Sequence, residues 1–391
     1  MASTTAHTRK NPTAHTRKNL ENLKRLAAKP LDRATAMEPA MYTDEGILDL
    51  EYQNIFRKGW LCAGRAESIP TQGDYLTYEI ADQPVVIIRQ KDGSIKAFAN
   101  VCRHRMMRLL EGRGRARRIM CPYHAWTYHM DGRLIGAPHM QETKCFERSK
   151  FNLFEVKCET WLGWIYVTLN KRPRSLKRQL AELTEVVAPY QMENYVEVAM
   201  EDHVWNTNWK QLTENFMEGY HLPVAHAATV GGFFPVEDTR FSEKKPNPAF
   251  TYQTFSKTED APVGTAHPDN KHLKGDARHT SVLPTIFPSH MMTLAPDHLW
   301  YLSLHPKGID QVRIRYGIAF APEVLEATKD KEALIRETKD FLDRVNEEDR
   351  FVTEGIWQGA VAPLSEPGPL SWLERENHEF TQYISRMLNR S

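Results

Sequence analysis

This 391-residue sequence has little cysteine, no long apolar run and almost no net charge. Its five cysteines form an odd, sparse set, which argues against a disulfide framework. No apolar run approaches the roughly 18 residues that a membrane-spanning helix needs, and the polar, basic N-terminus lacks the apolar core of a signal peptide. With 51 basic and 50 acidic residues, the overall charge favours neither nucleic acid nor a membrane as partner. We therefore expect a cytoplasmic protein.

The length allows two or three domains, and the pattern of elements predicts an α+β protein. Residues 1–19 contain a direct heptapeptide repeat that is polar and lacks aromatic residues, so we predict a mobile tail. Residues 20–172 begin with a weakly helical segment and become rich in strands after Trp60, whereas residues 173–391 mix helices with strands. The clearest predicted strands are 75–80, 84–89, 299–304 and 311–320, and the clearest predicted helices are 177–187, 208–221 and 323–357.

Two short motifs in the first half carry metal-binding chemistry. Cys102 and His104 form C-x-H, and after sixteen residues Cys121 and His124 form C-x-x-H. Two thiolates and two imidazoles on loops between strands can hold a [2Fe–2S] cluster, with the cysteines on one iron and the histidines on the other. Zinc is the alternative, since two cysteines and two histidines also form tetrahedral zinc sites. Zinc fingers pair cysteine with cysteine and histidine with histidine, however, so the mixed loops favour the cluster.

Candidate ligands for a second metal follow in the segment 208–226. Glu218 and His221 are three residues apart and would share one face of a helix. Pro223 is expected to end that helix, so that His226 can fold back beside His221. Two neutral imidazoles at a helix end are well placed for one divalent metal, although a pair of ordinary polar histidines would show the same spacing.

A carboxylate would complete the two-histidine, one-carboxylate triad of non-haem Fe(II) oxygenases, which leaves coordination positions open for O2. The acidic run 347–349 offers three candidates. Helical phase groups Asp349 with the apolar residues Val345, Val352 and Ile356, so Asp349 is the predicted third ligand. The alternative is that all three acids are solvated, as such runs usually are.

Taken together, the two motifs resemble those of a Rieske non-haem iron aromatic-ring-hydroxylating oxygenase, catalytic alpha subunit. The matching residues are Cys102, His104, Cys121, His124, Asn208-Trp209-Lys210, Asn215, Glu218, Tyr220-His221, His226 and Glu348-Asp349. The resemblance implies a small antiparallel-β Rieske domain, followed by a helix-grip-like catalytic domain in which helices accompany an antiparallel sheet. It also implies a [2Fe–2S] cluster in the first domain and a mononuclear non-haem Fe(II) at His221, His226 and Asp349.

The same resemblance implies partners and a route for electrons. Subunits of this family form head-to-tail trimers, in which the cluster of one subunit faces the iron of its neighbour and a carboxylate bridges the two. Glu218 stands at the bridging position, where many members have aspartate, and glutamate occurs in members that act on quaternary amines. A surface acid on a helix is the alternative role for Glu218. Asn215 is expected to order the site by hydrogen bonding.

The expected activity is that of a terminal oxygenase, which hydroxylates or oxidatively demethylates a small organic substrate with O2. A reductase or a ferredoxin would deliver electrons from NAD(P)H, because the chain has no G-x-G-x-x-G turn of its own. The chain is short for this family, which favours a homotrimer and monooxygenation, and aromatic catabolism is the expected setting. A dioxygenase forming cis-diols is one alternative, and a Rieske electron carrier without oxygenase activity is another. The predicted pocket is apolar, with candidates Phe233, Phe234, Phe250, Met291, Met292 and Trp300.

Overall fold

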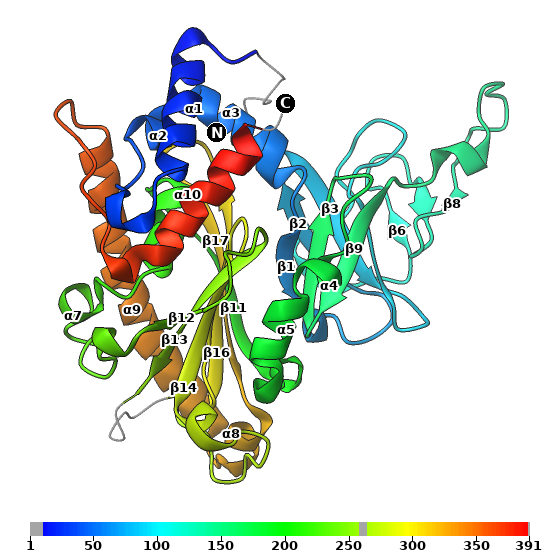
Figure 1. Ribbon diagram of the computed structural model, residues 1–391. Helices are drawn as coiled ribbons and strands as arrows, with labels where there is room; N and C mark the ends of the chain where they lie inside the picture. Colours follow the sequence, from blue (N-terminus) through cyan, green and yellow to red (C-terminus); the bar gives the residue numbers. More distant parts are fainter. Residues whose placement is uncertain (1–10, 258–263, 390–391) are drawn as a thin grey trace. The chain divides into compact units, whose positions relative to one another are not determined.

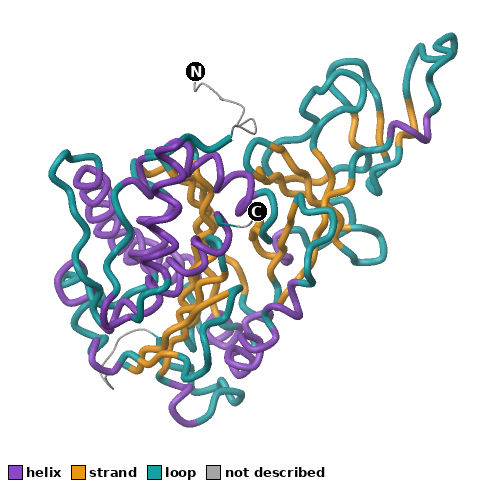
Figure 2. Tube along the Cα trace, turned by 45° about the horizontal axis from the view of Figure 1, so that its top comes forward, coloured by secondary structure: helices purple, strands orange, loops and turns teal. Residues whose placement is uncertain are grey.

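The structure is a computed structural model, and it describes residues 11–257 and 264–389. These residues divide into two compact units, one formed by 56–176 and the other by 11–55 together with 177–389. Antiparallel sheets and helices account for both units, which confirms the predicted α+β class (Figures 1 and 2). The first unit ends at Leu176, close to the boundary predicted at residue 172. The helical segment 20–55, however, belongs to the second unit, whereas the sequence pattern had placed it in the first.

Packing of the first described helix explains this difference. Helix α1 (Ala14–Ala27) lies alongside α10 (Arg375–Leu388) near the C-terminus (Figure 1). Its leucines Leu23 and Leu26, three positions apart on one face, are buried, and Thr16 in its first turn is buried as well. The predicted mobile tail is therefore wrong for the residues from 11 onward, whereas its first ten residues lie outside the described part of the chain. A weak amphipathic pattern became a stable helix because a distant helix covers its apolar face.

A buried ion pair ties the same segment to the second unit. Glu51 ends helix α3 (Glu45–Glu51), and its carboxylate lies 2.6 Å from Lys210 Nζ and 2.7 Å from Trp209 Nε1 on helix α6 (Trp209–Phe216). The side chains of the pair are at most 1% exposed. Burial raises the pKa of Glu51, and the Lys210 ammonium opposes that rise. Separating the segment from the unit would therefore leave a charge unpaired in the interior.

The first unit is built around antiparallel strands and has few helices. Its large sheet follows the order β1-β10-β9-β4-β3-β2-β5, and a small sheet follows β6-β7-β8. The strands are β1 (Leu61–Arg65), β2 (Asp74–Ile80), β3 (Gln83–Arg89), β4 (Ile95–Ala99), β5 (Arg113–Arg115), β6 (Ile119–Met120), β7 (Thr127–Tyr128), β8 (Leu134–Gly136), β9 (Glu155–Trp161) and β10 (Trp164–Thr168). The predicted strands 75–80 and 84–89 are thus confirmed as β2 and β3, which pair with each other.

The second unit contains one sheet in the order β11-β17-β16-β15-β14-β13-β12, with every neighbouring pair antiparallel. Helix α9 packs against β11, and α10 packs against β13 (Figure 1). The strands are β11 (Val196–Trp205), β12 (Arg240–Phe241), β13 (Phe250–Ser256), β14 (Thr280–Ile286), β15 (His290–Leu294), β16 (His298–Pro306) and β17 (Val312–Phe320). The further α-helices are α2 (Ala40–Thr43), α5 (Ala181–Val187), α7 (Leu222–Ala225), α8 (Pro322–Ala327) and α9 (Lys331–Ala360), while α4 (Leu176–Gln179) lies at the boundary of the units.

The single helix predicted over 323–357 is in fact two helices, α8 and α9. Asp330 interrupts it, because its side chain accepts a hydrogen bond from the Ala333 N–H at 2.9 Å and so caps α9.

Among the residues that the structure describes, no helix is both long and apolar enough to cross a bilayer.

We expect Lys210→Met to lower the free energy of unfolding by about 3–5 kcal/mol, because it leaves the Glu51 carboxylate buried without its cation. Arg57→Met is the matched control, since the Arg57–Asp82 pair is exposed and contributes less than about 1 kcal/mol. Urea unfolding of both variants checks the difference. Equal losses in the two variants would show that the buried pair does not hold the N-terminal segment.

Candidate active site with two metal centres

The two Cys/His loops of the first unit share one backbone geometry. In each loop the N–H of the fourth residue after cysteine donates to the cysteine carbonyl, from Met106 to Cys102 at 3.1 Å and from Ala125 to Cys121 at 3.0 Å. The donors Met106 and Ala125 both have a positive φ, of 57° and 56°. The cysteine N–H in turn donates to the carbonyl five residues further on, from Cys102 to Met107 and from Cys121 to Trp126, at 2.8 Å in both loops. The same turn therefore occurs twice and presents the two ligand pairs in the same way.

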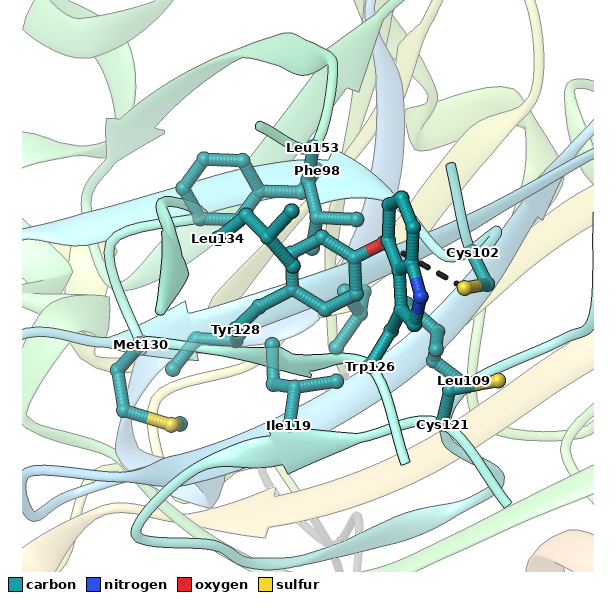
Figure 3. Close-up of a cluster of buried hydrophobic side chains, with 12 residues drawn as sticks. Phe98, Cys102, Leu109, Ile119, Cys121, Trp126, Tyr128, Met130, Leu134 and Leu153 are labelled. Carbon is teal, nitrogen blue, oxygen red and sulfur yellow. Dashed lines mark hydrogen bonds between the residues drawn. The ribbon is translucent and has the colours of Figure 1, made fainter. Parts of the chain in front are cut away.

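The sulfurs of these loops are buried, whereas the imidazoles reach the surface. Cys102 and Cys121 are 2% exposed and belong to an apolar cluster that includes Trp126 and Tyr128 (Figure 3). The rings of His104 and His124 are exposed and lie 4.8 Å apart between centroids. Burial raises the pKa of the Cys102 thiol, and the neighbouring Cys121 thiol adds to this rise. A buried pair of thiols beside an exposed pair of imidazoles fits a cluster with cysteines on the inner iron and histidines on the outer one.

Tyr128 adds an interaction that the sequence did not single out. Its hydroxyl oxygen lies 3.4 Å from Cys102 Sγ and accepts a hydrogen bond from the Arg103 N–H at 2.9 Å (Figure 3). The hydroxyl proton can then point to the sulfur. Hydrogen bonds to a ligating sulfur raise the reduction potential of a cluster, so Tyr128 is positioned to tune it.

Two histidines and one aspartate meet in the second unit. The Nε2 of His226 is 3.1 Å from Asp349 Oδ1, and the Nε2 of His221 is 3.6 Å from the same oxygen. One possible ligand atom from each of the three side chains lies within 4.8 Å of the others. The structure thus brings together the residues that the sequence grouped as a triad. Two imidazole nitrogens and one carboxylate oxygen are the donor set of a non-haem iron centre.

A second carboxylate holds each imidazole from behind. Glu218 Oε1 lies 2.6 Å from Nδ1 of His221, and Glu348 Oε2 lies 2.7 Å from Nδ1 of His226. Thr229 donates its hydroxyl to the same Glu348 oxygen at 2.6 Å. Carboxylates on Nδ1 leave Nε2 as the ligating nitrogen and fix the direction of each ring. Although burial disfavours a charged His226, Asp349 and Glu348 together raise its pKa.

The sequence did not reveal that Glu348 anchors His226, and it also mispredicted where the helix around Glu218 and His221 ends. Helix α6 ends at Phe216, well before the predicted end at 221, and Glu218 lies in the turn that follows. Pro223 does not end a helix but stands in the first turn of α7, where its missing N–H costs no hydrogen bond. The His221 N–H instead finds an acceptor in Glu218 Oε2 at 3.1 Å. The three-residue spacing of Glu218 and His221 therefore brings them together through a turn and not through a helix face.

The inward face of α9 agrees with the predicted phase only up to Asp349. Leu342 and Val345 are buried, and Asp349 follows them toward the triad. The next buried residue on this face is Thr353, whereas the predicted Ile356 is 46% exposed. Because an α-helix has 3.6 residues per turn, its buried face drifts slowly around the helix axis. The predicted positions Val352 and Ile356 lie on a face that has drifted away from the core by that point.

Asn215, predicted to order the site, lies on α6 and is 6% exposed. Within the described residues, no hydrogen bond joins its side chain to the triad. It lines a separate hollow together with Glu218 and His221, so it is close to the site but does not contact the three candidate ligands by hydrogen bonding. Its expected ordering role stays a prediction.

A cavity of about 100 Å³ opens onto the triad. His221, His226 and Asp349 line one part of it, and aromatic rings line much of the rest. The aromatic residues are Phe216, Phe234, Phe255, Trp300 and Phe341. Of the predicted pocket residues, Phe234 and Trp300 lie here. Phe250, Met291 and Met292 instead belong to the buried core, and Phe233 is absent from this lining. The sequence pattern did not single out Phe216 and Phe341, which come from α6 and α9 and lie outside the span of the predicted candidates, Phe233 to Trp300.

Comparison with known proteins agrees with this architecture. The family model described as "Ring hydroxylating alpha subunit (catalytic domain)" matches residues 192–390, and the Rieske [2Fe-2S] domain matches residues 59–147. A glycine betaine monooxygenase oxygenase subunit from Pseudomonas aeruginosa is 27% identical over 92% of this chain and 90% of its own length. A carnitine monooxygenase oxygenase subunit from Escherichia coli (strain K12) is 32% identical over 47% of this chain and 50% of its own. A solved quaternary ammonium Rieske monooxygenase has the same fold, with a TM-score of 0.80 at 23% identity over 93% of this chain and 97% of the other.

The chain belongs to the ring-hydroxylating oxygenase α-subunit family and carries both of its domains. It is a Rieske-type oxidoreductase, a terminal oxygenase component that uses O2 and electrons supplied by partner proteins. Its cofactors are a [2Fe–2S] cluster and a mononuclear iron. The predicted setting of aromatic catabolism is not supported, because the relatives are named for quaternary ammonium compounds. A Rieske electron carrier without oxygenase activity is excluded by the catalytic domain.

Glu348→Ala should weaken iron binding in the second unit by roughly tenfold to hundredfold, because His226 loses the carboxylate that orients it. Titration with a competing chelator measures this affinity. Glu347→Ala serves as the control, since Glu347 is an exposed neighbour on the same helix and should leave the affinity unchanged. Equal effects of the two substitutions would mean that Glu348 acts only through the charge of the helix.

Proposed function

We propose that this chain hydroxylates an N-methyl group of a quaternary ammonium substrate and thereby demethylates it. The carrying observation is the cavity that joins the triad to five aromatic rings. A quaternary ammonium cannot donate a hydrogen bond, so it is recognised through its charge and its methyl groups, which aromatic faces attract. Relatives named for glycine betaine and carnitine support the same substrate class. A hydroxylated N-methyl group leaves as formaldehyde, which turns monooxygenation into demethylation.

The side chains have distinct roles in this proposal. Cys102, His104, Cys121 and His124 would hold the cluster, and His221, His226 and Asp349 would hold the iron. When bound, the cluster supplies single electrons and the ferrous ion supplies open positions at which O2 is activated. Glu348 and Glu218 orient the two imidazoles from their Nδ1 side. The apolar wall of the cavity excludes water from the methyl group that reacts.

We further infer that electrons enter the second unit through Glu218 from a neighbouring copy of the chain. Glu218 contacts His221 and retains 12% exposure of its side chain, so a second group can reach it. A solved relative of the same fold is described with inter-subunit electron transfer. A carboxylate that hydrogen-bonds one imidazole from each subunit would shorten the path between the two irons.

Exposed apolar residues on each unit are consistent with contacts between copies of the chain, as the predicted homotrimer would require. Met106 and Tyr123, which flank the exposed imidazoles of the first unit, are 80% and 53% exposed. On the second unit Val224 and Phe351 are 83% and 82% exposed and line a hollow beside His221. Large apolar side chains at the rim of a site are typical of surfaces that a partner covers. The electron donor to the trimer would be a reductase, with or without a ferredoxin.

With a surrogate reductase and NADH, the iron-loaded protein should convert a quaternary ammonium carboxylate to its demethylated product and one equivalent of formaldehyde. Mass spectrometry and a formaldehyde assay measure the two products, with glycine betaine, carnitine and choline as substrates. The His221→Ala/His226→Ala double variant should lose turnover and fall from about three irons per chain to about two, because only the cluster remains. Hydroxylation of arenes without any formaldehyde would contradict the proposal.

With ferrous iron supplied in saturating excess to offset the weaker hold on His221, Glu218→Ala should keep its iron bound yet slow electron transfer from the cluster to the catalytic iron, because the bridge between two subunits is missing. Stopped-flow absorbance of the cluster, followed after mixing the reduced protein with O2 and substrate, reports this step directly. Glu347→Ala is the matched control, since it removes an exposed acid of the second unit for which the structure shows no hydrogen bond to His221 or His226 among the described residues. Cluster oxidation at the normal rate in Glu218→Ala would exclude the bridging role.

A further inference from the structure

One face of the second unit's sheet forms a wall of the cavity. Phe255 on β13 and Ser281 on β14 are directly opposite each other in the antiparallel ladder, and directly opposed side chains point to the same face of a sheet. Thr293 on β15 and Trp300 on β16 are paired in the same way. All four residues line the cavity. The sheet therefore presents the small side chain of Ser281 to the cavity beside large aromatic rings.

The hydroxyl of Ser281 is buried without a partner. Ser281 is 1% exposed, and its Oγ makes no hydrogen bond to any of the described residues. In the part of the chain that the structure describes, no other residue lining the cavity has a buried side-chain oxygen or nitrogen in this state. A buried hydroxyl without a partner costs stability, and such groups are rare in folded proteins. A ligand in the cavity would supply the missing partner.

Two other polar residues of the cavity wall differ from Ser281 in this respect. Nδ1 of His298 lies 2.7 Å from Asp297 Oδ1, and the charge of Asp297 also attracts Lys257. Both Lys257 and His298 line the cavity, but Asp297 already interacts with each of them inside the protein. A ligand that contacts Ser281, in contrast, displaces no hydrogen bond between described residues.

The ring of Phe255 separates Ser281 from the turn that carries Glu218 and His221. A Cβ at Gly219, within that turn, would lie 2.7 Å from Cζ of Phe255, so the tip of the ring reaches the turn. The base of the same side chain lies opposite Ser281, where paired Cβ atoms are about 5 Å apart. A ligand that has one end at the triad can therefore follow the Phe255 ring and bring its other end to Ser281.

We propose that the Ser281 hydroxyl donates a hydrogen bond to an oxygen of the substrate and is a specificity-determining residue. This inference rests on the proposed function and specifies its substrate class as quaternary ammonium compounds that carry a hydroxyl or a carboxylate. A methylated ammonium offers neither donor nor acceptor, so only the oxygen-bearing end of such a substrate satisfies Ser281, and the methylated end faces the triad. An analogue without oxygen leaves the hydroxyl unpaired and binds less well.

The test compares ligand binding to the iron-loaded protein by isothermal titration calorimetry, without a reductase and therefore without turnover. Choline and propyltrimethylammonium form the matched ligand pair, because they share one charge and differ by a methyl in place of the hydroxyl. Glycine betaine adds a carboxylate. The variants are Ser281→Ala and the control Ser256→Ala. Ser256 is an exposed residue of β13 that does not line the cavity, and its Oγ lies 3.2 Å from Thr280 Oγ1.

We expect Ser281→Ala to weaken only the ligands that carry oxygen. Choline should lose roughly threefold to tenfold in affinity and glycine betaine roughly tenfold to hundredfold, since hydrogen bonds to charged acceptors are stronger. Propyltrimethylammonium should stay within about twofold or bind more tightly to the variant. Ser256→Ala should leave all three affinities unchanged.

Urea unfolding without ligand separates this role from a structural one. The midpoint of Ser281→Ala should equal or exceed that of the wild type, because the variant removes a buried hydroxyl that no described residue satisfies. A clearly lower midpoint would show that the hydroxyl has a partner inside the protein, and it would overturn the proposal.

Two binding results would also overturn it. If Ser281→Ala weakens all three ligands equally, Ser281 shapes the cavity wall and does not recognise the oxygen. If the variant binds choline and glycine betaine as tightly as the wild type does, the hydroxyl makes no contact with them. Failure of the proposed function looks different, because then the wild type binds none of the three ligands and demethylates none of them.

Discussion

Two carboxylate–imidazole contacts organise the catalytic unit. Glu218 and Glu348 hold the Nδ1 atoms of His221 and His226 at 2.6 and 2.7 Å, and both rings consequently turn Nε2 toward Asp349. A divalent metal needs neutral imidazoles and an anionic oxygen in fixed directions, and side chains in a flexible turn would not provide them. The helix α9 supplies Asp349 and Glu348 together, so its docking beside α6 and α7 determines whether the site exists.

Buried polar contacts from the N-terminal segment hold α6 in that position. Glu51 pairs with Lys210 and Trp209, and the Tyr42 hydroxyl donates to Glu214 at 2.8 Å. Asn208 caps the same helix with its side chain. These groups stabilise the structure only while the segment and the helix stay together, because each would otherwise be buried without its partner. The segment that precedes the first unit in sequence is therefore part of the catalytic unit in space.

Some of the elements around the cavity could be predicted from local sequence patterns, and others could not. Strands β2 and β17 could be predicted from alternation, and β3 from a run of β-branched residues typical of a buried strand, four consecutive residues of which are buried. The end of α6 at Phe216 and the break before α9 were missed, because a turn closed by Glu218 and a cap by Asp330 depend on single side chains. Lys257 was missed for a different reason. A single lysine at the end of a strand matches no sequence motif, and only the structure shows that it lines the cavity.

The spacing of the cysteines and histidines by itself determined which four residues bind metal together and favoured a [2Fe–2S] cluster over zinc, because ligands within a short loop are placed by the loop and not by the rest of the fold. His221 and His226 are only five positions apart, and a break in the helix between them was enough to predict that they meet. Helical phase selected Asp349 from three neighbouring acids, but only the tertiary structure placed it beside both histidines, set Glu348 behind His226 and decided what lines the cavity. Asp349 and Glu348 lie more than a hundred positions further along the chain, and packing of α9 brought them there. Long-range contacts of this kind depend on how whole elements pack, and no local pattern encodes them.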